Sequence, residues 1–179
     1  VYQGTDPASA NTWALVGVYK IGKPLGRRCV LKKFGGDPII LTQDGAFPLS
    51  AVLQAGDARA RYAISFKIQQ AFSDAALAAG DVFGWTILSY PERKAIIVNV
   101  PIREDGPHEQ YVMNTITKAW CKFTGWHAED FAVLDGVLYF SQGNRIFRAW
   151  YGTDDNGSEI ICTAVQAYSD FGSGMIKDP

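Results

Sequence analysis

The sequence has few of the residues that build disulfide frameworks, metal centres or membrane-spanning helices. Its 179 residues include only three Cys (Cys29, Cys121 and Cys162) and two His (His108 and His127). All three Cys lie in apolar runs, which favours buried, reduced thiols over a disulfide framework. Neither His stands in a zinc-binding spacing such as H-E-x-x-H, so no metal site is indicated, and we expect both in loops. No apolar stretch approaches the ~20 residues of a membrane helix, so we expect no membrane contact.

The motifs of common catalytic sites are also missing. There is no G-x-S-x-G nucleophile motif and no G-x-x-x-x-G-K-[ST] phosphate loop. The carboxylates of Glu104, Asp105 and Glu109 cluster in a segment with Gly and Pro, which favours a solvated turn over an acid–base pair. A triad assembled by folding stays open, because its members need not be close in sequence. We nevertheless expect no enzyme activity and no cofactor.

Apolar, aromatic and turn-forming residues are abundant. Apolar residues make up 47% of the chain, which is enough for a core and argues against bulk disorder. Aromatic residues (5 Trp, 8 Tyr and 10 Phe) and turn residues (18 Gly and 8 Pro) favour strands and tight turns over helix bundles. The length predicts one domain over residues 1–179. Because the chain starts at Val1, without an initiator Met or a signal-peptide pattern, we expect a part of a longer gene product.

The charge is almost neutral in sum but unevenly distributed. Residues 1–33 hold six basic residues and one acid, Asp6, which gives +5; the other 146 residues hold 11 bases and 17 acids, which gives −6, and the total is −1. The end of the basic part, Arg27, Arg28, Lys32 and Lys33, is a candidate partner-binding edge. It would meet an acidic neighbour or a nucleic-acid backbone. A solvated strand and turn is the plainer interpretation of the same residues.

Short apolar segments separated by turn residues predict a meander of antiparallel strands of about 4–6 residues each. One segment differs: from Ile64 the apolar spacing becomes i, i+4, i+7, i+8, with Gly80 as a C-cap, which predicts one inserted helix near 57–79. The predicted strands cover residues 13–21, 29–34, 39–42, 46–47, 85–88, 95–100, 110–113, 119–123, 131–134, 137–140, 145–150 and 159–168.

Three segments share one local pattern, at residues 39–47, 111–120 and 138–147. Each has three apolar residues, then Thr, Asn or Ser, then a short polar turn, and an aromatic residue five or six positions after the small polar one. This pattern predicts hairpins and suits the blades of a β-propeller, although any antiparallel sandwich produces similar hairpins. At ~40–45 residues per blade the chain supplies fewer than four blades. The expected fold is therefore mainly β, with antiparallel, partly propeller-like sheets.

Four stretches of the sequence resemble a known protein family. They are residues 37–49 (DPIILTQDGAFPL), 95–101 (AIIVNVP), 110–126 (QYVMNTITKAWCKFTGW) and 135–147 (DGVLYFSQGNRIF). These stretches resemble tail and head-to-tail hub proteins of short-tailed bacteriophages, of the packaged-DNA stabilisation type. The resemblance implies propeller-like β domains and a structural role in the virion, assembled in the bacterial cytoplasm. It also implies self-association, contact with other virion proteins of the tail or portal side, nonspecific DNA contact and no enzyme activity.

A second hypothesis is a carbohydrate-binding or glycan-hydrolysing β-propeller. It depends on the loop carboxylates and on Trp85, Trp120, Trp126 and Trp150, which could line a sugar site by stacking. Their position near the ends of predicted strands favours packing in the core or between sheets.

Overall fold

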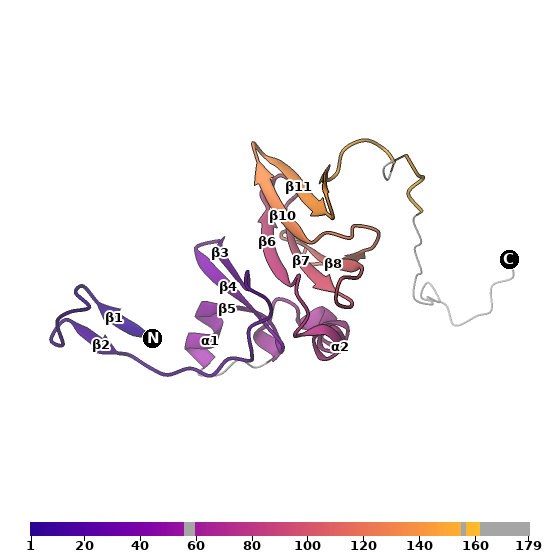
Figure 1. Ribbon diagram of the computed structural model, residues 1–179. Coiled ribbons are helices and arrows are strands. Elements are labelled where there is room, and N and C mark those ends of the chain that lie inside the picture. The colour runs from indigo at the N-terminus through magenta and orange to yellow at the C-terminus, as the bar shows by residue number, and fades with distance from the viewer. Residues whose placement is uncertain (56–59, 155–156, 162–179) are drawn as a thin grey trace, which may run out of the picture. The chain divides into compact units, whose positions relative to one another are not determined.

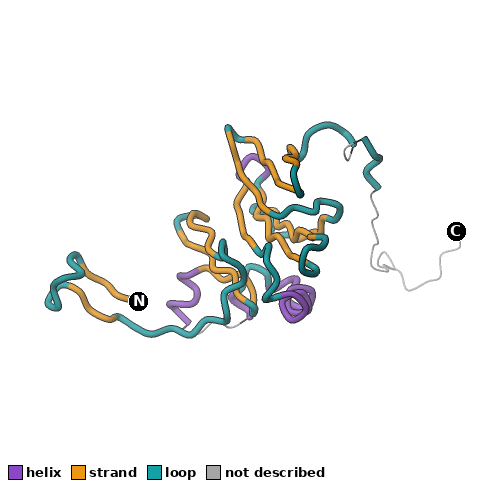
Figure 2. Tube along the Cα trace, viewed as in Figure 1, coloured by secondary structure: helices purple, strands orange, loops and turns teal. Residues whose placement is uncertain are grey.

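The computed structural model describes residues 1–55, 60–154 and 157–161, and the chain divides into two compact units, 1–149 and 150–179. The described part of the first unit contains four antiparallel sheets and two α-helices (Figures 1 and 2). In the second unit the Gly157 N–H donates to Asp154 Oδ1 at 3.0 Å. The prediction of a mainly β, antiparallel fold is confirmed.

Each sheet consists of strands that follow one another in the chain. Helix α1 (Leu49–Ala55) follows the second sheet, and helix α2 (Gln69–Ala79) precedes the third; short 3₁₀ turns lie at Ala60–Tyr62, Phe66–Ile68 and Pro91–Arg93. The sheets are β1 (Tyr2–Gly4) with β2 (Trp13–Leu15); β3 (Val30–Phe34), β4 (Asp37–Thr42) and β5 (Gly45–Pro48); β6 (Thr86–Tyr90), β7 (Ala95–Pro101), β8 (His108–Asn114) and β9 (Trp120–Phe123); and β10 (Asp130–Leu134), β11 (Val137–Gln142) and β12 (Arg145–Arg148).

All three predicted hairpins are confirmed, as β4–β5, β8–β9 and β11–β12. In two of them the small polar residue closes the turn as expected. Thr42 Oγ1 accepts the Asp44 N–H at 3.2 Å, and Asn114 Oδ1 accepts the N–H groups of Ile116 and Thr117. The turn of β10–β11 has positive φ at both central residues, Asp135 and Gly136, as a type I′ hairpin requires.

The predicted helix at 57–79 is shorter than expected. Its described part begins with the two 3₁₀ turns, and the α-helix starts only at Gln69; residues 56–59 lie outside the described residues. Helix α1 was not predicted, because its seven residues are too few to show a helical period. The predicted strand at 13–21 ends at Leu15, which pairs with Tyr2, the first residue of its partner β1.

Two further expectations fall partly outside the described residues. The predicted strand at 159–168 lies outside them from residue 162 onward, and residues 159–161 form no strand. Cys162 also lies outside. The other two Cys are free thiols, but Cys29 is half-buried and Cys121 is exposed, so the prediction of buried thiols is wrong for Cys121. Cys121 is in β9, an edge strand of its sheet.

The sheet β6–β9 is covered on both faces. The strand register places Ile87, Val98 and Tyr111 on one face, opposite one another across β6, β7 and β8. This face forms the main core with β4, β5 and α2; the other core residues are Leu25, Ile39, Leu41, Ala46, Phe72, Trp85, Ile96, Val100 and Met113. On the opposite face, Phe123 of β9 packs on Trp126 of the following loop at 5.4 Å, and Trp126 stacks on Phe140 of the β10–β12 sheet at 5.3 Å, both between ring centroids. All seven residues of β7 are buried, as a strand covered on both sides requires.

The first strands of the three larger sheets lie next to one another. β6 contacts both β3 and β10, and a parallel bridge joins Arg28, just before β3, to Thr86 in β6. Consecutive meander sheets packed face to face, with neighbouring first strands, are compatible with propeller blades. The described strands close no ring or barrel, however, so the propeller-like arrangement stays a prediction.

Candidate functional site

The predicted basic edge lies where the first strands of three sheets meet. Arg27 and Arg28 precede β3, Lys32 lies within it, and all three are exposed. The backbone of Lys33 belongs to β3, but its side chain lies outside the described part of the chain. The three described cations share one pocket of about 390 Å³, whose other lining residues are Val30, Thr86, Ile87, Leu88 and Phe131. The sequence predicted these cations, but not that residues of β6 and β10 line the same pocket.

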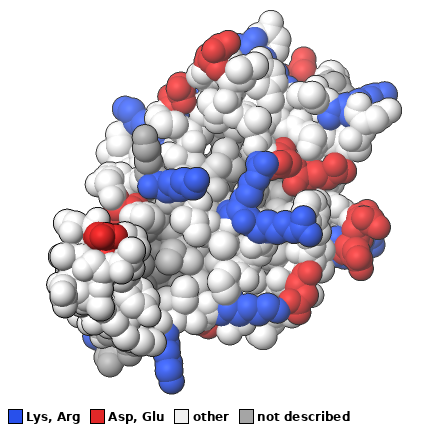
Figure 3. Space-filling model, turned by 60° about the vertical axis from the view of Figure 1, so that its left-hand side comes forward, with Lys and Arg blue, Asp and Glu red and all other residues white. Residues whose placement is uncertain are grey.

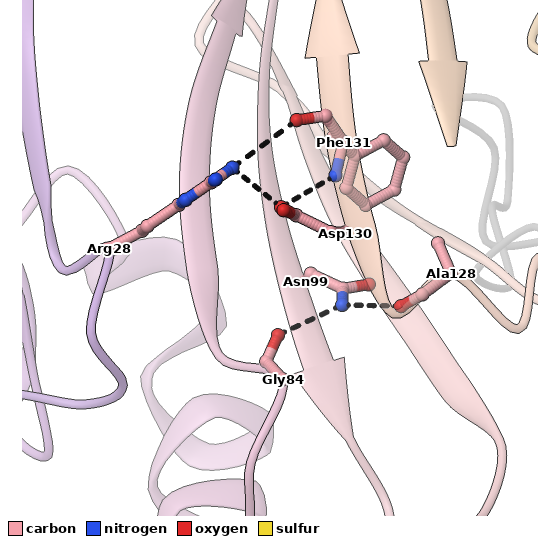
Figure 4. Close-up of polar contacts among 6 residues, drawn as sticks. All are labelled: Arg28, Gly84, Asn99, Ala128, Asp130 and Phe131. Atoms are coloured by element: carbon pink, nitrogen blue, oxygen red, sulfur yellow. Dashed lines mark hydrogen bonds and ion pairs between the residues drawn. The ribbon is translucent and has the colours of Figure 1, made fainter. Parts of the chain in front are cut away.

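Arg28 is held in place by the start of β10 (Figure 4). Its Nη1 donates to Asp130 Oδ1 at 2.7 Å and, more weakly, to the Phe131 carbonyl at 3.5 Å. The same carboxylate oxygen accepts the Phe131 N–H at 2.8 Å. Because both charged side chains are about half exposed, the ion pair contributes at most about 1 kcal/mol. It orients the guanidinium and compensates its charge.

A second pocket of about 220 Å³ adjoins the first, since both are lined by Arg27, Arg28 and Thr86. Its other lining residues are Phe83, Gly84, Trp85, Glu129 and Asp130. Two carboxylates therefore lie beside the basic residues. On the face seen in Figure 3, Asp and Glu side chains are likewise interspersed among Lys and Arg. The surface is not uniformly positive.

Asn99, a polar residue in the buried strand β7, hydrogen-bonds to the two loops that form the second pocket (Figure 4). Its Nδ2 donates to the Gly84 carbonyl at 2.9 Å and to the Ala128 carbonyl at 2.7 Å. Gln110, opposite on β8, donates from Nε2 to Asn99 Oδ1 at 2.9 Å and to the Trp126 carbonyl at 2.8 Å. We call Asn99 and Gln110 the amide pair. The sequence analysis missed it, although a lone Asn in the apolar run AIIVNVP is a signal.

Gly26 allows the basic segment to approach β6 closely. Its φ is +72°, and a Cβ at this position would lie 2.1 Å from the Trp85 carbonyl oxygen. Only glycine fits such a backbone contact without a shift. Gly26 therefore sets the position of Arg27 and Arg28.

His108 also lies at this junction, and its predicted place in a loop is wrong. It lies in β8 and is 7% exposed, whereas His127 is in an exposed loop as predicted. A Cβ on Gly84 would lie 2.3 Å from His108 Nε2, so the ring packs directly on the Gly84 backbone. Burial lowers the pKa of His108, and the nearby Glu129 carboxylate only partly opposes this.

We expect the burial of His108 to make stability depend on pH. Below the ordinary His pKa of 6.5 the unfolded chain takes up a proton that the folded chain resists. The free energy of unfolding should therefore fall as pH drops below this value, by up to about 1.4 kcal/mol per pH unit. The free energy of unfolding of His108→Gln, measured by urea unfolding at several pH values, should depend less steeply on pH than that of the wild type. His127→Gln is the control, and an equal reduction of the pH dependence in it would contradict the assignment.

The other candidate residues of the first unit lie in an exposed turn, an ion pair or packing contacts. Glu104 and Asp105 lie in an exposed turn, as predicted, while Glu109 is in β8 and binds Lys122 of β9 at 3.0 Å. Three of the four Trp that suggested a sugar site pack in the first unit: Trp85 is buried, Trp120 donates to the Ile64 carbonyl, and Trp126 stacks on Phe140. Trp150 belongs to the second unit.

Within the described residues, no group of three or more His, Cys, Asp or Glu side chains is placed to hold a metal ion. Among the same residues, no helix is long and apolar enough to span a bilayer. Comparisons with protein-family models, curated proteins and solved structures found no match.

Proposed function

We propose that this protein is a structural component of a short-tailed bacteriophage virion, part of the tail hub between head and tail that helps to retain packaged DNA. The sequence resemblance points to this class of protein. The observation that supports an assembly role is the exposed apolar residues on the outer face of the β10–β12 sheet.

This outer face is defined by the strand register. Leu134 is opposite Val137 and Ala132 is opposite Tyr139, while the alternate residues Phe131, Leu138 and Phe140 face the β6–β9 sheet. Ile146 of β12 shares the outer face, paired with Ser141. Leu134 is 64% and Ile146 is 78% exposed.

The β6–β9 sheet has apolar residues on both faces, and the residues of its central strand β7 are buried on both sides. The outer face of the β10–β12 sheet combines the exposed Leu134 and Ile146 with the polar residues Asp130, Ser141 and Arg148, which share this face by register. Exposed apolar residues bordered by polar ones are typical of a protein–protein contact. The partner of this face is then a second copy of the chain, because the sequence resemblance implies self-association. A heterologous contact repeated around an axis closes a ring.

We expect charged residues on this face to prevent assembly. Leu134→Lys combined with Ile146→Lys should turn the oligomer of the wild-type protein into monomers in native mass spectrometry, with an unchanged far-UV spectrum. The matched control is Leu77→Lys on α2, a residue that is 87% exposed and lies on another element. A wild-type monomer, or a double variant that assembles normally, would contradict the proposal.

The virion role has its own test. The coding sequence should lie among genes for portal, terminase or other tail proteins, and the gene product should be present in purified particles. Particles made without it should lose their DNA. A metabolic gene neighbourhood, or absence from the particles, would reject this role whatever the oligomeric state.

A further inference from the structure

The edges of β3 and β6 are open beside the 390 Å³ pocket. In the described part of the chain, each of these strands has a ladder partner on one side only, β4 and β7 respectively. A single parallel bridge joins the two edges, at Arg28 and Thr86, where the Ile87 N–H donates to the Arg28 carbonyl at 3.3 Å. Past this bridge, Val30, Lys32 and Leu88 line the pocket between them. Open strand edges of this kind accept an additional strand.

The lining of this pocket combines positive charge with apolar surface. Arg27, Arg28 and Lys32 are its charged residues, and no carboxylate lines it. Asp130 already compensates Arg28, whereas Arg27 and Lys32 have no ion-pair partner among the described residues. Apolar lining comes from β3, β6 and β10. An occupant that matches this surface carries acidic side chains alternating with apolar ones.

We propose that the pocket binds an extended acidic segment of a partner protein, which adds a strand at the open edges of β3 and β6. Its carboxylates lie on the face of the strands that carries Lys32, beside Arg27 in the same pocket, and its alternate apolar side chains lie on the opposite face, which carries Ile87. The inference deepens the proposed function and rests on it for the identity of the partner, a neighbouring virion protein. It gives Arg27 and Lys32 a specific ligand in place of general electrostatic attraction.

Two observations favour a peptide over nucleic acid. Affinity for DNA comes from neutralising many phosphates along an extended basic surface, and this pocket offers two uncompensated cations. Glu129 and Asp130 line the adjoining pocket, where they would repel a continuing phosphate backbone. An extended peptide has short acidic side chains and backbone groups that fit one pocket and two strand edges.

The test is fluorescence anisotropy with labelled peptides at about 0.15 M salt. A Glu-Val repeat peptide should bind the wild-type protein saturably. A Gln-Val repeat should bind about tenfold more weakly, because it lacks the charges. A Glu-Pro repeat keeps the charges but has no N–H at every second residue, so it should lose binding as well. Equal binding of the Glu-Val and Glu-Pro repeats would overturn strand addition.

Variants locate the site. Arg27→Glu with Lys32→Glu should weaken binding of the Glu-Val repeat by about a hundredfold. Lys67→Glu with Lys94→Glu introduces the same change of charge at two exposed positions outside the pocket and should leave it unchanged. Thermal unfolding checks that both variants are folded. Equal weakening by the two pairs would reduce the effect to net charge and overturn the site.

The outcomes separate this inference from the proposed function. Tighter binding of a single-stranded oligothymidylate of about 20 nucleotides, lost in the Arg27/Lys32 variant, would replace the peptide with nucleic acid as ligand. No saturable binding of the Glu-Val repeat would overturn the inference alone, because oligomer formation and presence in particles are measured independently.

Discussion

Replacing Asn99 with Ala is expected to lower the free energy of unfolding by about 3 kcal/mol or more. The change leaves the carbonyls of Gly84 and Ala128 and the amide of Gln110 without the partner they have in the fold. A buried polar group left without a partner costs roughly 1–3 kcal/mol. Urea unfolding monitored by Trp fluorescence gives the value, and the m-value shows whether the native state stays compact.

Asn114→Ala is the matched control for this change. Asn114 is on the neighbouring strand β8, but it is exposed, and its side chain accepts two N–H groups of a turn open to water. Its replacement should cost about 1 kcal/mol. Because Asn99 and Gln110 bond to each other, the double variant Asn99→Ala with Gln110→Ala should lose less than the sum of the single variants. Additive losses, or equal losses at Asn99 and Asn114, would contradict the role of the amide pair.

Replacing Gly26 with Ala is expected to cost about 2–4 kcal/mol, which combines about 1 kcal/mol for the positive φ with 1–3 kcal/mol for the clash. The new methyl group would overlap the Trp85 carbonyl, which belongs to the backbone and cannot rotate away. The segment before β3 should therefore move away from β6. Hydrogen exchange of the Ile87 amide, which donates to the Arg28 carbonyl, should become faster.

Gly36→Ala separates the clash from the backbone conformation. Gly36 also has a positive φ, +88°, but a Cβ there meets nothing within 4 Å. It should cost about 1 kcal/mol and leave exchange at Ile87 unchanged. If the two glycine variants lose the same free energy of unfolding and change exchange at Ile87 equally, the close contact with Trp85 is not the reason why position 26 needs glycine.

The parts of the fold that follow from neighbouring residues were predictable from the sequence. The turn at Asp135 and Gly136 needs only two residues with positive φ, and the turns at Thr42 and Asn114 need only a side chain that bonds its own backbone. The extended segment after Leu15 was not predictable. Its apolar residues continue the strand pattern, but the partner strand β1 has three residues, so no ladder continues.

The junction between the sheets depended on contacts distant in sequence. The run of bases indicated Arg27, Arg28 and Lys32, but Asp130, the partner of Arg28, lies 102 residues away. The roles of Asn99, Gln110 and His108 depend on loops at residues 84 and 126–129 that no local pattern assigns to them. A lone polar residue in an apolar strand signals a buried partner, but it does not identify that partner.

Each sheet of the first unit is built from one uninterrupted stretch of chain. A whole sheet can therefore be gained, lost or exchanged between genes by recombination at two points, without altering any strand pairing in the others. Proteins with this organisation can diversify by shuffling segments as well as by point substitution. Gly26 and Asn99 limit that freedom, because Gly26 packs on the Trp85 backbone next to β6 and Asn99 of β7 bonds to the Ala128 carbonyl before β10, and a transferred segment would need to keep those contacts.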